Sequence, residues 1–245
     1  MHSPVSRAGS YFDQVTVGAQ DATRADRDFL LAFAARARAA DILRLRIADT
    51  VGIARPQTVT DLIRSIKAFV PGLPVEFHGH NDLGMATANA LCALEAGAEA
   101  VSVTVGALGE RAGNTALEQM AMVLLQHPRL NCQVDTKKLL ELCRMVADAA
   151  GQPIPPSQPV VGKRVFSHES GIHCHAMFRD ARTYEPFTPQ LAGHASRCFV
   201  LSTHSGVAAI RQLLNEVGIH ASPEQARALK PLLTTGIWSH KRKAA

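Results

Sequence analysis

The chain has 245 residues, a net formal charge of +5 and 47% hydrophobic residues, which is typical of a globular protein able to bury a sizeable core. Its basic residues form no stripe interleaved with aromatic residues, so the composition argues against a nucleic-acid partner. Its five cysteines form no CxxC pair, no apolar run reaches the length of a membrane span, and the first residues lack the apolar core of a signal peptide. We therefore expect a cytoplasmic protein with reduced thiols and no membrane partner.

The first half of the chain repeats a strand, a loop and a helix in four successive units. The period is about 30 residues, as expected for the βα units of a parallel sheet. The pattern predicts strands at 14–17, 43–48, 74–77 and 100–105, and helices at 24–40, from 56 onward, at 86–96 and at 114–125. The predicted fold class is therefore α/β.

Chemically rich residues directly follow each predicted strand: Gln20 and Asp21, Asp49 and Thr50, 78–82, and 110–114. This placement is expected at the C-terminal mouth of a TIM (β/α)8 barrel. A doubly wound sheet is the competing fold, but no G-x-G-x-x-G follows the first strand. Because a closed barrel takes eight units, four units predict the C-terminal half of a barrel with open strand edges. Either the chain pairs with another polypeptide or it lacks a first half.

Composition divides the chain into four regions. Residues 1–128 are expected to form the partial barrel. A helix and a Pro-rich stretch at 151–159 make up a connecting region at 129–160. Residues 161–230 are expected to form a small α/β subdomain, and the basic tail at 231–245 is expected to be disordered because its apolar pattern is lost.

The third predicted strand carries an unusual set of polar residues. Glu76, His78 and His80 alternate with the apolar Val75 and Phe77, so the three polar side chains point the same way. Two imidazoles and a carboxylate on one face of a core strand indicate two metal ligands with a nearby acid or base. A pair of hydrogen-bonded structural histidines at a strand edge is the alternative.

Five motifs follow one another in a fixed order, at 78–89, 109–114, 167–173, 183–185 and 204–206. In this order they resemble the homocitrate synthase and 2-isopropylmalate synthase family. The resemblance implies a metal-dependent TIM-barrel acyltransferase that condenses acetyl-CoA with a 2-oxo acid and hydrolyses the thioester to release CoA. Related lyases carry a cysteine-containing glycine loop where this chain has 110–114, so the resemblance disfavours cleavage chemistry.

The resemblance also implies roles for single residues. His78 and His80 match the two metal-binding histidines, and Asn114 matches a third, weaker oxygen ligand, although a helix N-cap also explains it. Thr50 matches the threonine whose hydroxyl meets the carboxylate of the 2-oxo acid, with closure of a turn as the alternative. The metal is divalent, and zinc, manganese and magnesium are all compatible with imidazole and oxygen ligands.

Glu76, His173 and Tyr184 match the catalytic residues of the family. A relay of these three residues would supply a base, with pKa near neutral, for the methyl group of acetyl-CoA. For His168 and His175 we prefer structural roles. The resemblance also implies a homodimer in which the small subdomain covers the active site of the neighbouring chain.

Glu76 separates the two branches, because homocitrate synthases tend to carry Glu-x-His-x-His and isopropylmalate synthases usually lack that glutamate. Other segments resemble most the homocitrate synthases of nitrogen-fixing bacteria, which use 2-oxoglutarate and supply homocitrate for the nitrogenase cofactor. Two departures stand out. The family's first strand, with an Arg-Asp-Gly motif that supplies a metal-binding aspartate, is absent, and Gln20 stands where relatives usually carry a glutamate.

Three hypotheses follow from these observations. The first is a homocitrate synthase part that is active when a separate chain supplies the missing half-barrel. The second is an inactive or regulatory fragment of the same family. The third is a 2-isopropylmalate synthase, which Glu76 and the lack of a leucine-sensing C-terminal domain disfavour.

Overall fold

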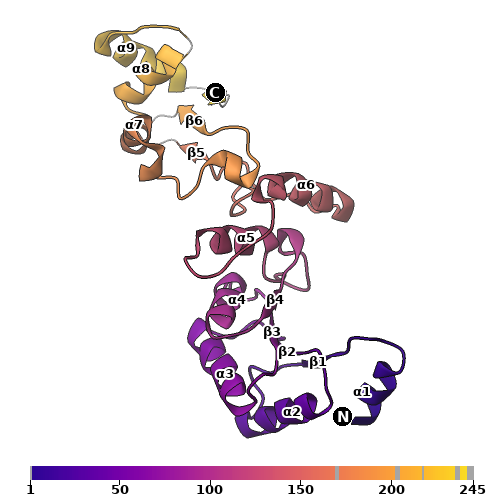
Figure 1. Cartoon of the computed structure of the whole chain (residues 1–245). Helices are drawn as coiled ribbons and strands as arrows, with labels where there is room; N and C mark the ends of the chain where they lie inside the picture. The colour runs from indigo at the N-terminus through magenta and orange to yellow at the C-terminus, as the bar shows by residue number, and fades with distance from the viewer. Residues whose placement is uncertain (1, 169–170, 202–204, 217, 235–237, 242–245) are drawn as a thin grey trace. The chain divides into compact units, whose positions relative to one another are not determined.

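The structure is a computed structural model that describes residues 2–168, 171–201, 205–216, 218–234 and 238–241 (Figure 1). The chain divides into two compact units, Met1–Cys132 and Gln133–Ala245. We describe each unit by itself. No helix in the described part of the chain is long and apolar enough to cross a membrane.

The first unit is built on a parallel sheet with its strands in chain order. The strands are β1 (Thr16–Ala19), β2 (Arg44–Asp49), β3 (Val75–Gly79) and β4 (Ala100–Ser102). The helices are α1 (His2–Gly9), α2 (Arg27–Ala39), α3 (Pro56–Phe69), α4 (Ala86–Glu95) and α5 (Leu117–Gln126). Each strand is thus followed by a helix, which confirms the four predicted βα units; α1 was not predicted.

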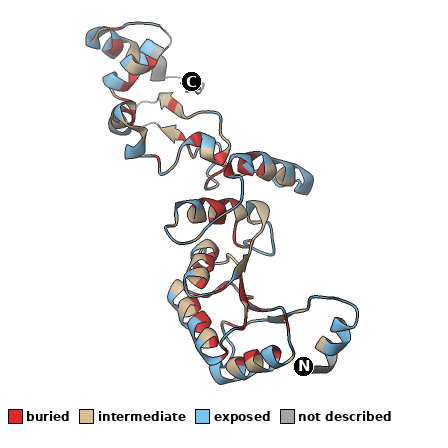
Figure 2. Ribbon diagram, in the orientation of Figure 1, coloured by how far each residue is buried: buried red, intermediate tan, exposed pale blue. Residues whose placement is uncertain are grey.

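The two faces of this sheet differ in character. Leu45, Ile47, Val75 and Phe77 are fully buried and belong to the core that also takes in side chains of α2, α3 and α4. Figure 1 shows these three helices along one side of the sheet, and Figure 2 shows buried positions on both layers. Because side chains alternate along a strand, the polar residues of β2 and β3 lie on the opposite face.

The observed ends of two elements differ from the predicted ends. The strand expected at 100–105 stops at Ser102, and a short 3-10 turn (Val105–Ala107) follows it. The helix expected from 114 begins only at Leu117, because isolated bridges hold Asn114 and Ala116 in extended backbone. The residues before α5 are therefore available to line the loop region rather than to start a helix.

The second unit combines helices with a small mixed sheet. Its helices are η2 (Thr136–Lys138), α6 (Leu139–Ala150), α7 (Gly171–Arg179), η3 (Ala181–Thr183), η4 (Pro189–Ala192), α8 (Val207–Glu216) and α9 (Pro223–Thr234). Its strands are β5 (Ser167–His168), β6 (Cys198–Leu201) and β7 (Trp238–Lys241), with β5 parallel and β7 antiparallel to β6. A separate core centred on Phe199 and Ile210 packs this unit.

The predicted disorder of residues 231–245 differs from the structure in two places. Helix α9 continues to Thr234, and Trp238–Lys241 forms β7. The physical reason is that the outer edge of β6 offers unpaired backbone groups, which the tail satisfies by antiparallel pairing. The division between the units at Cys132 and Gln133 places the connecting helix with the second unit.

Candidate functional site

The carboxyl end of β3 brings His78 and His80 together. Their Nε2 atoms are 3.2 Å apart and their rings meet edge to face, with centroids 4.9 Å apart. His78 is the penultimate residue of β3, and His80 follows directly where the backbone turns into the loop. Burial lowers the pKa of His78, and the neighbouring His80 and Arg46 lower it further while Glu76 opposes them. His78 is therefore neutral at pH 7, as a metal ligand must be.

The separation of these nitrogens suits a single metal ion. Nitrogen ligands lie about 2.0–2.1 Å from zinc, so two atoms of one coordination sphere are separated by roughly the distance observed here. A direct hydrogen bond between a donor and an acceptor imidazole fits the same distance. Within the described residues, no third His, Cys, Asp or Glu completes a cluster with this pair.

Asn114 supplies a candidate oxygen beside the pair. An antiparallel bridge holds its backbone against His80, and its Nδ2 donates to the carbonyl oxygen of Leu108 at 3.2 Å. Its Oδ1 is buried and has no hydrogen-bond partner among the described residues, and the same holds for Nδ1 of His80. A buried acceptor without a partner is costly unless a ligand satisfies it. The donor set of two imidazoles and an amide oxygen thus fits a divalent cation.

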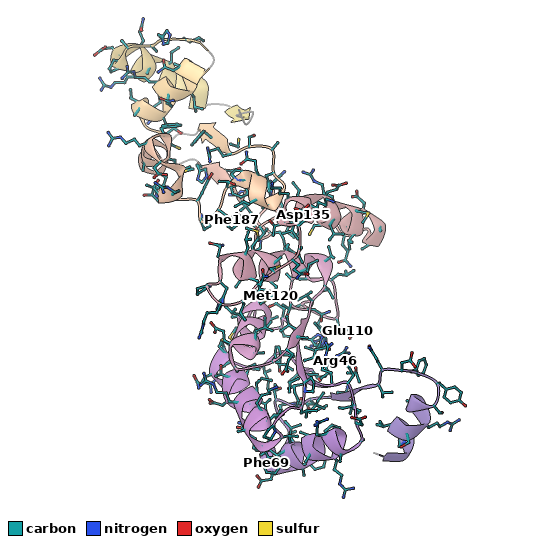
Figure 3. All side chains as sticks on the ribbon, viewed as in Figure 1. Arg46, Phe69, Glu110, Met120, Asp135 and Phe187 are labelled. Atoms are coloured by element: carbon teal, nitrogen blue, oxygen red, sulfur yellow. The ribbon has the colours of Figure 1, made fainter. Side chains whose placement is uncertain are left out.

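Glu76 lies on the same strand face but is held by arginines. It accepts hydrogen bonds from Arg46 Nε at 2.7 Å, from Arg44 Nη1 at 3.0 Å and from the hydroxyl of Ser102. Figure 3 shows Arg46 on the side of the sheet away from α3. Burial raises the pKa of Glu76, but the hydrogen bonds from Ser102 and Arg46 and both positive charges outweigh it, and the net shift is downward. Glu76 is therefore a fixed negative charge at pH 7 and not a proton acceptor in this arrangement.

The loops after β1, β2, β3 and β4 are tied to one another. The Thr50 hydroxyl accepts a hydrogen bond from the backbone N–H of Asp21 at 2.7 Å, which joins the loop after β2 to the loop after β1. Its proton stays available to donate to a ligand. Arg111 donates to both carboxylate oxygens of Asp82, at 2.7 and 2.8 Å, and to the backbone carbonyl of Thr50 at 2.9 Å. These contacts fix the spacing of the loops around the histidine pair.

In the second unit His173 and Tyr184 lie against each other. Their ring centroids are 4.1 Å apart with an interplanar angle of 35°. His173 comes from α7, and Tyr184 follows η3. The sequence motif that predicted this pair therefore corresponds to a real contact, although Glu76 belongs to the other unit.

The pair is flanked by a buried ionic cluster. Glu185 accepts two hydrogen bonds from Arg197, at 2.9 and 2.8 Å, and its Oε1 lies 3.2 Å from His168 Nε2. Glu185 is buried, which a carboxylate tolerates when its partners are this close. This contact supports the structural role expected for His168, which stays a prediction.

Sequence reasoning missed several of these partners. Arg46 lies opposite Glu76 in the register of the parallel sheet, and Arg44, two residues earlier on the same face of β2, also reaches it. This proximity could be recognised only after the strands were aligned. Arg197 gave no local signal. Residues 169, 170 and 204, which fall within the predicted motifs, and the side chain of His175 lie outside the described part of the chain.

Two known families match the chain. The family described as HMGL-like matches residues 1–146, and the family described as homocitrate synthase post-HMGL domain-like matches residues 160–234. The boundary between them falls in the Pro-rich linker.

Curated relatives share high identity with the chain. Homocitrate synthase 1 of Nostoc sp. is 43% identical over 88% of this chain and 56% of its own. The 2-isopropylmalate synthase 2 of Caldanaerobacter subterraneus is 45% identical over 89% of this chain and 56% of its own. A putative (R)-citramalate synthase of Archaeoglobus fulgidus is 40% identical over 88% and 44%. The chain spans about half the length of the curated relatives it matches.

Among solved structures, the hydroxymethylglutaryl-CoA lyase from Pseudomonas aeruginosa matches 62% of this chain and 55% of its own, with a TM-score of 0.55 and 19% identity. A likeness at this identity shows the fold alone. The four βα units of the first unit are thus part of a TIM barrel, as the sequence predicted.

Proposed function

The chain belongs to the HMGL-like family, and on that basis we propose that it carries part of the active site of an acyltransferase, one that condenses acetyl-CoA with 2-oxoglutarate to give homocitrate and CoA. The observation that carries the proposal is the histidine pair, whose Nε2 atoms are 3.2 Å apart. Beside it, on the adjoining strand bridge, the Oδ1 of Asn114 has no partner in the described part of the chain. Homocitrate made in this way would serve nitrogenase cofactor synthesis.

His78, His80 and Asn114 would hold a divalent cation, with zinc, manganese and magnesium as the candidates. When bound, the cation polarises the 2-oxo group of the acceptor and stabilises the negative charge that develops on its oxygen. The Thr50 hydroxyl donates a hydrogen bond to the carboxylate of the same substrate. Its oxygen already accepts a hydrogen bond from the Asp21 N–H, which leaves its own proton free to point at the substrate.

His173 takes a proton from the methyl group of acetyl-CoA, and Tyr184 orients its ring through their contact. Glu76 of the neighbouring chain, an ionised carboxylate, would be the third member of this relay and would orient the His173 ring. The enolate carbon then bonds to the 2-oxo carbon, and the former 2-oxo oxygen takes up a proton to become the hydroxyl group of the product. Water hydrolyses the thioester to a carboxylate and releases CoA. A homodimer in which each small subdomain serves the barrel of its neighbour belongs to this proposal.

The choice of 2-oxoglutarate rests on charge. Arg44 and Arg46 together carry two positive charges against the single negative charge of Glu76, which favours a dicarboxylic acceptor on this face. The 45% identity to a 2-isopropylmalate synthase makes that activity, with its branched-chain 2-oxo acid, the second candidate.

The test is a CoA-thiol release assay with a divalent metal, comparing 2-oxoglutarate with 3-methyl-2-oxobutanoate. The chain is assayed alone and mixed with the N-terminal barrel half of the Frankia alni homocitrate synthase, a 44% identical relative. We expect release in the mixture, with 2-oxoglutarate preferred. Preference for 3-methyl-2-oxobutanoate would support the isopropylmalate synthase, and no release in any mixture would support an inactive fragment.

The metal site is tested without activity. His78→Gln is expected to weaken the binding of Co²⁺ by more than about tenfold, because it removes one of two nitrogen ligands. Isothermal titration of the chain with Co²⁺ measures this, and the exposed His220, changed to Gln, is the matched control. Equal affinity of His78→Gln and the unaltered chain would contradict the assignment.

A further inference from the structure

A pocket of about 480 Å³ lies wholly within the second unit. It is bounded by α6, by the Pro-rich linker and by the segment that runs from η4 to β6. Figure 1 shows this segment next to the start of α6, where η4 packs against η2. The pocket lining includes neither the histidine pair nor the His173–Tyr184 contact, so the pocket has no part in the proposed condensation.

One wall of the pocket is held in an unusual backbone conformation. Val160, at the end of the linker, has a φ of 70°, which is rare for a β-branched residue. His194 donates from Nε2 to its carbonyl oxygen at 3.0 Å and thereby joins the linker to the segment after η4. Gly193 has a φ of 83°, and a Cβ there would lie 2.5 Å from the carbonyl oxygen of Lys137. These contacts preset the wall, and strained backbone of this kind clusters at binding sites.

The floor of the pocket is apolar. Its apolar lining residues include Leu140 and Ala147 of α6 and Ile154 and Val161 of the linker and the residues after it. Small-molecule sites typically have volumes of about 300–1,000 Å³ and mostly apolar linings with a few polar groups. The volume of this pocket falls in that range, and its lining combines apolar with polar side chains.

Positive charge surrounds this apolar floor. Arg144 and Lys163 line the pocket, and within the described part of the chain neither side chain forms an ion pair or a hydrogen bond; the backbone carbonyl of Lys163 accepts one, from the Ser167 hydroxyl. Burial lowers the pKa of His194, its hydrogen bond to Val160 opposes the shift, and Arg144 lowers the pKa further. Asp148 is the one acidic residue of the lining, on α6 four positions beyond Arg144. Two cations against one carboxylate in a concave site leave a net attraction for anions.

We propose that this pocket binds a small organic anion whose carboxylate or phosphate head is held by Arg144 and Lys163 and whose apolar body lies on Leu140, Ile154 and Val161. An inorganic anion would make no contact with the apolar residues, and a neutral apolar molecule would make no ion pair with Arg144 or Lys163. The site is independent of the proposed acyl transfer and stands or falls separately from it.

The test uses three probes that share one apolar body: hexanoate, hexan-1-ol and hexylammonium. Each is titrated into the full chain while the backbone amide signals are followed by NMR. We expect hexanoate to shift the amide signals within 144–148, 154–163 and 193–196, and these shifts should saturate. We also expect it to bind at least tenfold more tightly than the other two probes. Binding of hexanol with the affinity of hexanoate, or shifts confined to other residues, would overturn the proposal.

Two variants separate the head group from the body. Arg144→Gln changes an exposed helix position and is expected to weaken hexanoate at least fivefold. Arg179→Gln, which removes one exposed arginine of α7 in the same unit, is the charge-matched control and is expected to leave the affinity unchanged. Ala147→Leu places a larger side chain in the pocket and should abolish binding. Unchanged affinity in Arg144→Gln, or equal losses in Arg144→Gln and Arg179→Gln, would contradict the assignment.

Discussion

Two buried carboxylates, one in each unit, are paired with arginine. Glu76 is 7% exposed and meets Arg44 and Arg46, and Glu185 is 7% exposed and meets Arg197 through two hydrogen bonds. A buried ion pair adds little net stability, but a buried carboxylate that loses all its partners is strongly destabilising. Each glutamate is therefore a fixed charge that holds neighbouring side chains in place.

The second unit contains two imidazoles that resist protonation. Burial lowers the pKa of both His168 and His194, against the opposing effects of Glu185 and of the Val160 carbonyl. An unperturbed histidine has a pKa of about 6.5, so the unfolded chain binds more protons than the folded chain once the pH falls below that value. The stability that these groups contribute is thus present above about pH 6.5 and is lost as the pH falls.

We therefore expect the thermal midpoint of the second unit to fall between pH 7 and pH 5. Circular dichroism melts across this range measure it, and His168→Gln and His194→Gln should each flatten the dependence. His220→Gln changes an exposed histidine and should leave the change of the thermal midpoint with pH unaltered. A midpoint that rises on acidification would contradict this reading.

At the scale of elements, the loops after the strands matter more than the strands. The loop after β4 passes through Gly113, where φ is 89° and a Cβ would lie 2.0 Å from the carbonyl oxygen of Ala107. Gly113 also accepts a hydrogen bond from the backbone of Asn81 at 2.9 Å, which links this loop to the one after β3. The position of Asn114 beside His80 depends on this tight turn.

Gly113→Ala is expected to lower the free energy of unfolding by more than about 1 kcal/mol, because the new Cβ adds a backbone clash to the cost of the left-handed conformation. Urea denaturation measures the change. Gly106→Ala is the matched control, since Gly106 has a φ of 65° but no atom within 4 Å of its Cβ position. An equal loss of unfolding free energy in the two variants would show that the backbone around residue 113 moves to relieve the clash, and would contradict the prediction.

At the scale of the whole molecule, each unit has a hydrophobic core of its own. The core of the first unit includes Ile63, which is fully buried, and the core of the second includes Phe199, which is 2% exposed. Two separate cores are the condition under which parts of a chain unfold as separate cooperative units.

Calorimetry of the chain is accordingly expected to show two transitions. Ile63→Ala should lower the free energy of unfolding of the first unit alone, by about 2–5 kcal/mol, and so shift only its transition. Phe199→Ala should lower that of the second unit alone, by about 3–5 kcal/mol. Each variant is the control for the other. A single transition that both substitutions shift equally would show that the units fold as one.

The sequence determined the features that depend on neighbours along the chain. Alternation fixed the common face of Glu76 and His78, and the recurrence of strand, loop and helix fixed the four βα units. The motif around His173 and Tyr184 identified a pair whose rings do touch. These features follow from backbone periodicity and from short stretches of chain, which is why they can be read without a structure.

Only the tertiary structure decided which groups meet across long separations. The contact of Arg46 with Glu76 spans 30 residues and exists because the parallel register places the two side by side. The late start of α5 comes from strand bridges that no local pattern encodes, and the Oδ1 of Asn114 has no hydrogen-bond partner among the residues that the structure describes. The packing of the whole unit determines the strand register and the paths of the loops. It therefore also determines which groups each charged residue contacts.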